Sequence, residues 1–411
     1  MPDSNIVPLL YIISANIKGY KSIEDLSVEL KPGMNIIIGK NGAGKSNFME
    51  ALYNAMLSIY STKEITFRSS QLLLKSYNGE ELLYSIERQN LKHVLSSQFD
   101  EDLYMQKLEL NGKVVYNSSN DEAVTFEHNG RKYPMVKNIR GIFHRLKIPI
   151  LIPNFVKFAI PDDIAGVMTP TSIRIPVEYD EPWEMDSRSG FLQSAAQTLE
   201  DRFSSPLLDM GPITSAKLQA EWARRLAEIT PDQVISNMLL SEEVLINLKK
   251  FSPIEDLRIN ENITFYEDNS YLIADNIRLD FYINGSWLPW SQLSDGTRRL
   301  FFIISDISLS GHGTILMEEP ELGVHPHQFD LVMQFLKEQS ISKQIIVSTH
   351  SPKAIDILSS KQLDAILIAS YHKGKGTKLA RMAEGQKRKA LDYMESVGFL
   401  SDYWLMSDLE Q

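Results

Sequence analysis

One stretch of eight residues near the N-terminus has the residue types and the spacing to bind a triphosphate. It matches the pattern G-x-x-x-x-G-K-[ST] in full and reads Gly39-Lys40-Asn41-Gly42-Ala43-Gly44-Lys45-Ser46. In such a loop, successive backbone N–H groups and the start of a helix point at one place, which attracts phosphate. We expect the loop through Asn47 to bind a nucleotide, with Lys45 reaching the β- and γ-phosphates and the Ser46 hydroxyl holding Mg²⁺.

The segments on either side of this loop provide the context that the pattern requires. Residues 34–38 form a short, mostly apolar run that ends in three isoleucines, which predicts a buried strand. Residues 47–60 predict a helix, because apolar side chains recur at helical spacing at Phe48, Leu52, Ala55, Met56 and Ile59. The alternative is a chance glycine turn, and the flanking strand and helix argue against it.

Two adjacent carboxylates follow an apolar run much later in the chain. Residues 315–320 read Ile-Leu-Met-Glu-Glu-Pro, so Glu318 and Glu319 stand at the end of a predicted buried strand. Beside a phosphate loop, Glu318 can bind Mg²⁺ through water, and Glu319 can polarise the water that attacks the γ-phosphate. The alternative is an acidic turn after a core strand.

A histidine and a helix-capping motif complete the set. Residues 344–350 predict a strand that delivers His350 at its C-terminal end, where we expect it to sense the γ-phosphate; a structural histidine is the alternative. Residues 293–297 read Leu-Ser-Asp-Gly-Thr before an apolar helix over 298–309. There, Ser294 or Asp295 can cap the helix, and Gly296 allows the backbone to approach a ligand closely. By itself this motif fits an ordinary helix cap equally well.

Composition excludes several classes of protein. The chain has 411 residues, a formal charge of −11 and no cysteine. Disulfides, thiolate metal sites and a cysteine nucleophile are excluded, and a reducing cytoplasm is favoured. No apolar run reaches the roughly 18 residues of a membrane span, and residues 1–10 lack the features of a secretion signal. We therefore expect a cytoplasmic protein without membrane contact, whose overall charge does not attract nucleic acid.

The remaining pattern predicts strands early and late in the chain, with a helical part between them. Early strands are expected at residues 11–17, 23–30, 81–88, 103–110 and 114–116, the last two joined by an Asn-Gly hairpin turn at 111–112. In the middle of the chain we expect helices at 191–203, 214–229 and 231–250, followed by strands within 271–290. Late in the chain, strands at 314–317, 344–348 and 363–369 are expected to alternate with helices at 327–338 and 352–358. This late alternation predicts a mostly parallel sheet.

Taken in order, the motifs resemble the ATP-binding-cassette (ABC) ATPase heads of the group that contains RecF, the structural-maintenance-of-chromosomes (SMC) proteins and OLD (overcoming lysogenization defect). The resemblance rests on residues 17–22 (Ile-Lys-Gly-Tyr-Lys-Ser), 39–47, 293–296, 318–321 with His325-Pro326, and 348–352. It covers both ends of the chain well and residues 60–280 poorly. It implies an α/β fold of the P-loop NTPase, ABC-ATPase type, with a mixed sheet core, an antiparallel β part and a helical lobe.

We accordingly expect three segments. Residues 1–150 would form the first part of the nucleotide-binding lobe, 151–290 an inserted helical lobe, and 291–411 the signature helix and the rest of the nucleotide-binding lobe. Heads of this group pair head to tail around two ATP molecules, which implies a homodimer or a higher even oligomer. The nucleotide would contact Lys45, Ser46, Glu318, Glu319 and His350 of its own subunit and the signature Ser294, Asp295 and Gly296 of the other.

The chain departs from the family pattern at two positions. Glu318 stands where the family usually has aspartate, which leaves room for slow hydrolysis, and Asp295 stands where transporter cassettes carry glycine. OLD nucleases add a Toprim domain with an Asp-x-Asp motif, and residues 351–411 contain no such motif. The resemblance therefore implies an ATPase subunit that gates a separate effector, a nuclease or a toxin, in bacterial anti-phage defence.

Two other functions remain open. One is a RecF-like DNA repair or recombination ATPase that binds DNA itself, and the other is an ATP-binding scaffold with little turnover. One basic stretch bears on the choice: residues 373–389 carry seven lysines and arginines. It could contact DNA, a phage component or the effector, or it could be an ordinary exposed face.

Overall fold

The structure is a computed structural model that describes residues 10–61, 65–88, 104–118, 126–128, 130–133, 139–146, 154–156, 171–176, 184–185, 242–260, 262–268, 271–310 and 313–407. Contacts divide the chain into two compact units. The first comprises Met1–Phe158, Ser310–Leu322 and Phe329–Gln411, and the second comprises Ala159–Leu309 and Gly323–Gln328. The three-segment division stays a prediction. None of the helices in the described ranges is long and apolar enough to cross a membrane.

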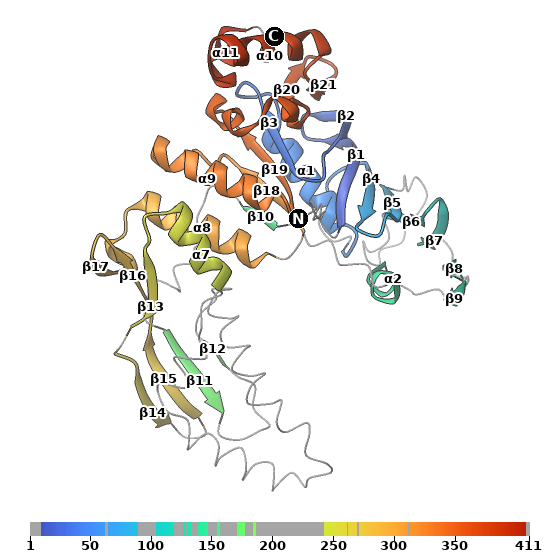
Figure 1. Ribbon diagram of the computed structural model, residues 1–411. Coiled ribbons are helices and arrows are strands. Elements are labelled where there is room, and N and C mark those ends of the chain that lie inside the picture. Colours follow the sequence, from blue (N-terminus) through green and yellow to red (C-terminus); the bar gives the residue numbers. More distant parts are fainter. Residues whose placement is uncertain are drawn as a thin grey trace. The chain divides into compact units, whose positions relative to one another are not determined.

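The first unit contains a sheet whose strands come from distant parts of the chain (Figure 1). Its order is β10-β18-β19-β3-β20-β21, with bounds Asn154–Val156, Thr314–Glu318, Gln344–Thr349, Met34–Ile38, Ile366–His372 and Gly376–Arg381. All neighbours pair in parallel except β20 and β21. Every residue of β3 and β19 is buried, as is typical of parallel strands with both faces covered. The predicted mostly parallel sheet is confirmed.

The second sheet of this unit is antiparallel. Its order is β2-β1-β4-β5-β6-β7, with bounds Ile23–Glu29, Leu10–Tyr20, Ser69–Ser76, Glu81–Arg88, Tyr104–Leu110 and Lys113–Asn117. Side chains alternate between a buried face and an exposed face, which is the expected pattern for a sheet with one face in solvent. The buried face shares one apolar core with α1 (Lys45–Leu57) and α2 (Ile139–Leu146). A small pair, β8 (Phe126–His128) and β9 (Arg131–Tyr133), also belongs to this unit.

Both Asn-Gly dipeptides form the turns that their backbone preferences predict. Asn111 and Gly112 have φ angles of 49° and 77°, and Asn284 and Gly285 have φ angles of 52° and 79°. Two successive positive φ angles are the requirement of the type I′ hairpin turn, which Asn and Gly tolerate best. The first turn joins β6 to β7 as predicted, and the second joins β16 to β17.

The second unit combines two helices with two small sheets. Helices α7 (Glu242–Phe251) and α8 (Asp295–Leu309) pack together, and the Asn247 amide donates a hydrogen bond of 2.9 Å to the Ser308 hydroxyl. The sheets are β13-β16-β17 and β12-β11-β15-β14, with bounds Asp256–Ile259, Leu279–Ile283, Ser286–Pro289, Glu184–Met185, Thr171–Pro176, Tyr271–Ile277 and Thr264–Asp268. The predicted helices 191–203 and 214–229 lie outside the described residues. The same holds for residues 231–241 of the third predicted helix, 231–250.

Several element boundaries differ from the sequence predictions. The first strand runs three residues beyond Ile17, to Tyr20, and α8 begins at Asp295 rather than at 298. Residues 352–357 form a 3₁₀ helix instead of an α-helix, and a second 3₁₀ helix at 360–365 delays the next strand to Ile366. That second turn is fixed by Gln362, whose Oε1 accepts hydrogen bonds from the Ser359 N–H (3.1 Å) and the Ser359 hydroxyl (3.0 Å). Strand β4 was not predicted.

Candidate nucleotide-binding site

The phosphate loop lies between a buried strand and a bare helix N-terminus. Strand β3 ends at Ile38, α1 begins at Lys45, and the loop turns through positive φ angles at Gly42 (79°) and Gly44 (93°). Gly44 is the N-cap residue, no side chain caps the helix, and its first turn holds no acidic residue. The first N–H groups of α1 and its partial positive charge are therefore left to an external anion, which fits a nucleotide phosphate.

Lys45 places a buried ammonium group inside this loop. Only 5% of the residue is exposed. Its Nζ donates hydrogen bonds to the carbonyl oxygens of Gly39 (2.6 Å) and Lys40 (3.3 Å), and it lies 3.1 Å from Nδ1 of His350. The positive charge is thus held at the centre of the loop, beside the helix N-terminus, where a phosphate oxygen would be attracted to both.

His350 connects Lys45 to the second carboxylate of the late strand. Its Nε2 lies 3.0 Å from Oε1 of Glu319. In β18 and β19, Glu318 pairs with Ser348, and the Glu319 N–H donates to the Ser348 carbonyl (2.8 Å). Three predicted site residues therefore form one continuous chain of polar contacts: Lys45 at the start of α1, and His350 and Glu319, which directly follow β19 and β18.

Glu319 holds this position with an unusual backbone. Its φ is +48°, in the left-handed region that side chains other than glycine rarely adopt. Such strain persists where the surrounding structure enforces it and is common at functional sites. Here the backbone hydrogen bond to Ser348 and the contact with His350 fix the residue on both sides.

Glu321 is a site residue whose contacts the sequence did not predict. Its Oε1 accepts hydrogen bonds from the His350 N–H (2.7 Å) and from the Thr349 hydroxyl (2.8 Å). It therefore fixes the end of β19 and, with it, the direction of the histidine. The Glu-Pro-Glu spacing at 319–321 was the available signal, because it places a second carboxylate beside the same strand end.

The two proposed magnesium ligands are oxygen donors that a Mg²⁺ ion accepts. Ser46 is exposed in the first turn of α1, and Glu318 is partly buried at the end of β18. Mg²⁺ favours carboxylates, phosphate oxygens and water over cages made of protein alone. The described residues contain no group of three His, Cys, Asp or Glu side chains that could hold a metal ion.

The segment before β2 lies against the first turns of α1. The side-chain amide of Asn47 donates to the Ser22 hydroxyl (2.6 Å), so Asn47 contacts protein with its side chain. Lys21 pairs with Glu50, and this hydrogen bond raises the pKa of the Lys21 ammonium group above its usual value. Lys40, Asn41 and Gly42 are exposed, whereas Ala43 is buried.

The signature residues belong to the second unit. The Ser294 hydroxyl accepts a hydrogen bond from the Thr297 N–H (3.2 Å), so Ser294 caps α8. Asp295 is exposed and pairs with Arg298 at 3.3 Å. A Cβ atom on Gly296 would lie 2.7 Å from Oε1 of Gln328, which is the end of a flexible side chain that can move aside, so local packing alone does not require glycine there. The capping role expected as the alternative is present; a role toward a second subunit's nucleotide stays a prediction.

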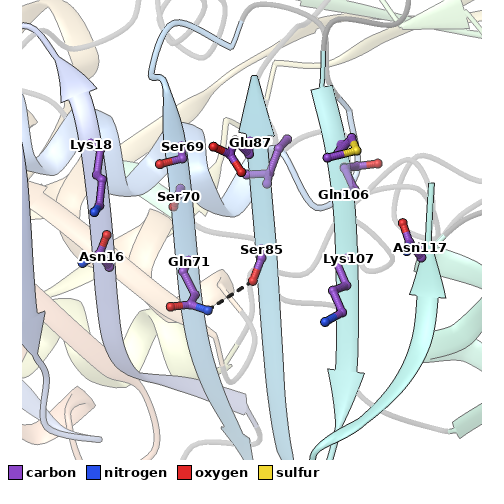
Figure 2. Close-up of a pocket in the computed structure, with 12 residues that line it drawn as sticks. Asn16, Lys18, Ser69, Ser70, Gln71, Ser85, Glu87, Gln106, Lys107 and Asn117 are labelled. Atoms are coloured by element: carbon purple, nitrogen blue, oxygen red, sulfur yellow. Dashed lines mark hydrogen bonds between the residues drawn. The ribbon is translucent and has the colours of Figure 1, made fainter. Parts of the chain in front are cut away.

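A separate polar hollow of about 420 Å³ lies on the exposed face of the antiparallel sheet (Figure 2). A single cross-strand row runs through it, made by Asn16, Gln71, Ser85, Lys107 and Asn117 in pairwise register. Both lysines of its lining are paired with carboxylates, Lys18 with Asp25 (3.0 Å) and Lys107 with Glu109 (2.6 Å). The hollow therefore offers no surplus positive charge for a nucleic-acid backbone.

Comparison with known proteins gives two family matches. A family described as "AAA ATPase domain" matches residues 11–154, and one described as "AAA domain, putative AbiEii toxin, Type IV TA system" matches residues 216–356. The chain is 22% identical to the "Retron Vc95 probable ATPase" of Vibrio cholerae serotype O1 biovar El Tor, over 82% of this chain and 69% of the relative. It is also 22% identical to the "Retron Ec83 probable ATPase" of Escherichia coli, over 86% and 71%.

Shorter or weaker similarities are found to a repair protein and to a solved structure. The chain is 28% identical to "DNA replication and repair protein RecF" of Francisella tularensis subsp. mediasiatica over 21% of this chain and 27% of the relative. Among solved structures, the "SMC head domain from Thermotoga maritima" aligns with 90% of this chain and 99% of that chain, at 12% identity and a TM-score of 0.46.

The fold and the loop geometry define a P-loop nucleotide-binding ATPase. The order of its motifs and the family and sequence matches narrow the class: they support an ABC-type ATPase similar to the group that contains RecF, SMC and OLD-like proteins. The predicted class and the predicted type of enzyme are thus confirmed.

Proposed function

We propose that this ATPase binds Mg·ATP at residues 39–47, hydrolyses it, and pairs with a second copy around two nucleotides to gate a separate effector. The observation that carries the first part is the polar chain from Lys45 through His350 to Glu319, which ends beside a helix N-terminus free for phosphate. Phosphate binding at α1 would bring the γ-phosphate to the Lys45 ammonium group, where its charge is stabilised.

The carboxylate of Glu319 is proposed to accept a proton from the attacking water. His350 holds this carboxylate through Nε2, and Glu321 holds His350 through its backbone N–H. Positioning of this kind matters because phosphoryl transfer depends on in-line geometry and on charge stabilisation. Ser46 and Glu318 would hold Mg²⁺, which when bound would neutralise charge on the β- and γ-phosphates.

Two variants test this assignment. Lys45→Ala is expected to lose ATP binding, whereas Glu319→Gln is expected to bind ATP and to lower kcat by a factor of about 100 or more, because a positioned base contributes about that much. Glu395→Gln, the same change at an exposed residue of α10 (Glu384–Ser396), serves as the matched control. Turnover of Glu319→Gln at the wild-type rate would show that the role is wrong, and absent wild-type turnover would favour the scaffold.

Pairing around ATP is proposed to use Ser294, Asp295 and Gly296 of one copy against the γ-phosphate held by the other, in a homodimer or a higher even oligomer. The helix-capping bond allows a selective test, because aspartate also caps helices well. Ser294→Asp should leave α8 intact but repel a phosphate, so ATP-dependent dimers should disappear in light scattering while ATP binding persists. Ser294→Asn, a neutral cap, is the control. Normal dimers of Ser294→Asp would contradict the proposal.

An effector partner, a nuclease or a toxin acting in antiviral defence, is supported by the names of the relatives. Two of them are called retron ATPases, and one matching family is described with a toxin–antitoxin system. Co-expression with the neighbouring gene product, followed by a test of ATP-dependent co-purification and of growth arrest, examines this step. Loss of co-purification with Lys45→Ala is expected.

Direct DNA binding is the less favoured function. Three of the basic residues in 373–389 bond within the protein: Lys378 to the Asp25 carbonyl, Arg381 to the Glu29 carbonyl, and Lys387 to Asp364. Of the three, only Lys387 is neutralised by a carboxylate, because a carbonyl carries no net charge. The argument against direct DNA binding is therefore the formal charge of −11, which gives the chain as a whole no attraction for a phosphate backbone. ATP-dependent binding of duplex DNA by the isolated chain would reverse this preference.

A further inference from the structure

The phosphate loop rests on a hairpin that the motif analysis did not connect with it. Strands β20 and β21 pair in register from Leu367 with Arg381 to His372 with Gly376. A Cβ atom built on Gly39 would lie 2.4 Å from the Ala369 carbonyl oxygen of β20, and one built on Gly44 would lie 1.9 Å from Oγ1 of Thr377 on β21. Both ends of the loop therefore lie directly against this hairpin.

Thr377 makes the closest of these contacts and is fully buried. Its hydroxyl lies 2.7 Å from the Ser22 hydroxyl, and its N–H donates to the Ser22 carbonyl (2.8 Å). The Ser22 hydroxyl in turn accepts the hydrogen bond from the Asn47 side chain, in the first turn of α1. A chain of hydrogen bonds thus runs from β21 through Ser22 into the helix whose N-terminus faces the phosphate site.

We propose that Thr377 is a positioning residue for nucleotide binding, which acts through Gly44, Ser22 and Asn47 and does not touch the nucleotide. This inference rests on the proposed ATP site. The physical reason is preorganisation: several backbone N–H groups must point at one phosphate, and fixing the loop and the first turn before binding removes an entropic cost from binding. Thr377 restricts the conformational freedom of the phosphate loop in two ways, by its hydrogen bond to Ser22 and by van der Waals contact with Gly44.

The hydroxyl and the methyl group of Thr377 can be tested separately. Thr377→Val keeps the shape but loses the hydroxyl, and it places a methyl group against Gly44, where the space is tight. Thr377→Ser keeps the hydroxyl and loses the methyl group. Because one buried hydrogen bond typically changes an equilibrium by a factor of about ten, Thr377→Val is expected to raise the Kd and KM for Mg·ATP about tenfold, with kcat within about twofold. Thr377→Ser should stay within about twofold of the wild type.

The matched control is Thr314→Val, since Thr314 is also fully buried in the same sheet and its hydroxyl also donates a side-chain hydrogen bond, to Gln344 at 3.1 Å. Thr314 lies at the opposite end of its strand from Glu318. The Thr314→Val substitution should therefore lower the unfolding temperature without changing the Kd for Mg·ATP. Calorimetric titration of the full chain with ATP and Mg²⁺ gives Kd, and a steady-state assay gives KM and kcat.

Three results would overturn the inference while leaving the ATP site in place. They are an unchanged Kd in Thr377→Val, an equal loss in Thr377→Ser, and an equal loss in Thr314→Val. A wild-type chain that binds no ATP would overturn the proposed function and this inference together. A tenfold loss confined to Thr377→Val would support the positioning role, because general destabilisation would affect the control variant as well.

Discussion

Gln344 offers the most direct test of how the two sheets of the first unit are held together. It opens β19, is fully buried, and uses its amide as a peptide group would. Its Nε2 donates to the carbonyls of Ile12 (2.8 Å) and Lys31 (2.8 Å), and its Oε1 accepts from the Ile12 N–H (2.9 Å) and the Thr314 hydroxyl (3.1 Å). One side chain therefore joins β1 of the antiparallel sheet to the central sheet.

Replacement of Gln344 by leucine keeps most of the volume and removes all four hydrogen bonds. The backbone N–H and carbonyl of Ile12 then lose their Gln344 partner, whereas the Lys31 carbonyl keeps the hydrogen bond from the Asn35 amide (2.9 Å). At about 1–3 kcal/mol for each of these two buried groups, partly offset by burying leucine, the expected loss is about 2–4 kcal/mol. A local loss of about 3 kcal/mol corresponds to amide exchange that is more than 100 times faster.

Hydrogen exchange measured by mass spectrometry on peptides that cover β1 (Leu10–Tyr20) is the appropriate assay. Gln71→Leu is the control, since Gln71 is exposed and makes one hydrogen bond of 3.3 Å, to Ser85. It should change stability by less than about 0.5 kcal/mol. Exchange in β1 of Gln344→Leu within about threefold of the wild type would refute the reasoning, because the four bonds would then contribute nothing to holding the sheets together.

Two further outcomes follow from other contacts. Tyr84→Phe removes a fully buried hydroxyl that donates to the Ser58 carbonyl (2.8 Å) and accepts from the Gln106 amide (3.0 Å), so Tm should fall by about 2–5 °C in calorimetry, while Tyr77→Phe at an exposed position should not lower it. The hydrogen bond from Lys387 lowers the pKa of Asp364. Because a lowered folded-state pKa stabilises at neutral pH and not in acid, Lys387→Met should cost under about 1 kcal/mol at pH 7 by urea unfolding. The difference should shrink as the pH falls below 3.8; a constant difference would contradict this explanation.

Local features of the site were predictable from the sequence because they depend on neighbouring residues. The phosphate loop, both Asn-Gly turns and the strand that ends at Glu318 each follow from a few adjacent side chains and their backbone preferences. The polar chain from Lys45 to Glu319 was also within reach, since parallel strands end at one edge of a sheet and the motifs follow those strands.

Contacts across long separations were not predictable in the same way. Thr377 and Ser22 are 355 residues apart, and no local pattern marks Thr377 as a neighbour of the phosphate loop. Gln344 reads as the first residue of an apolar strand, although its side chain acts as a partner of β1. Strand β4 escaped prediction because its three consecutive leucines hide an alternation in which Leu72 and Leu74 are buried.

The order of strands in the central sheet has a consequence for synthesis on the ribosome. Strand β3 is made from residues 34–38, but its two neighbours are β19 (Gln344–Thr349) and β20 (Ile366–His372). Both hydrogen-bonding edges of β3 therefore stay without their partner strands until more than 300 further residues have been translated. Contacts of such long separation form late and leave unpaired strand edges exposed meanwhile. During synthesis, the strand that leads into the phosphate loop is therefore unpaired on both edges. A chaperone or a ribosome-bound partner that covers these edges would act during this period.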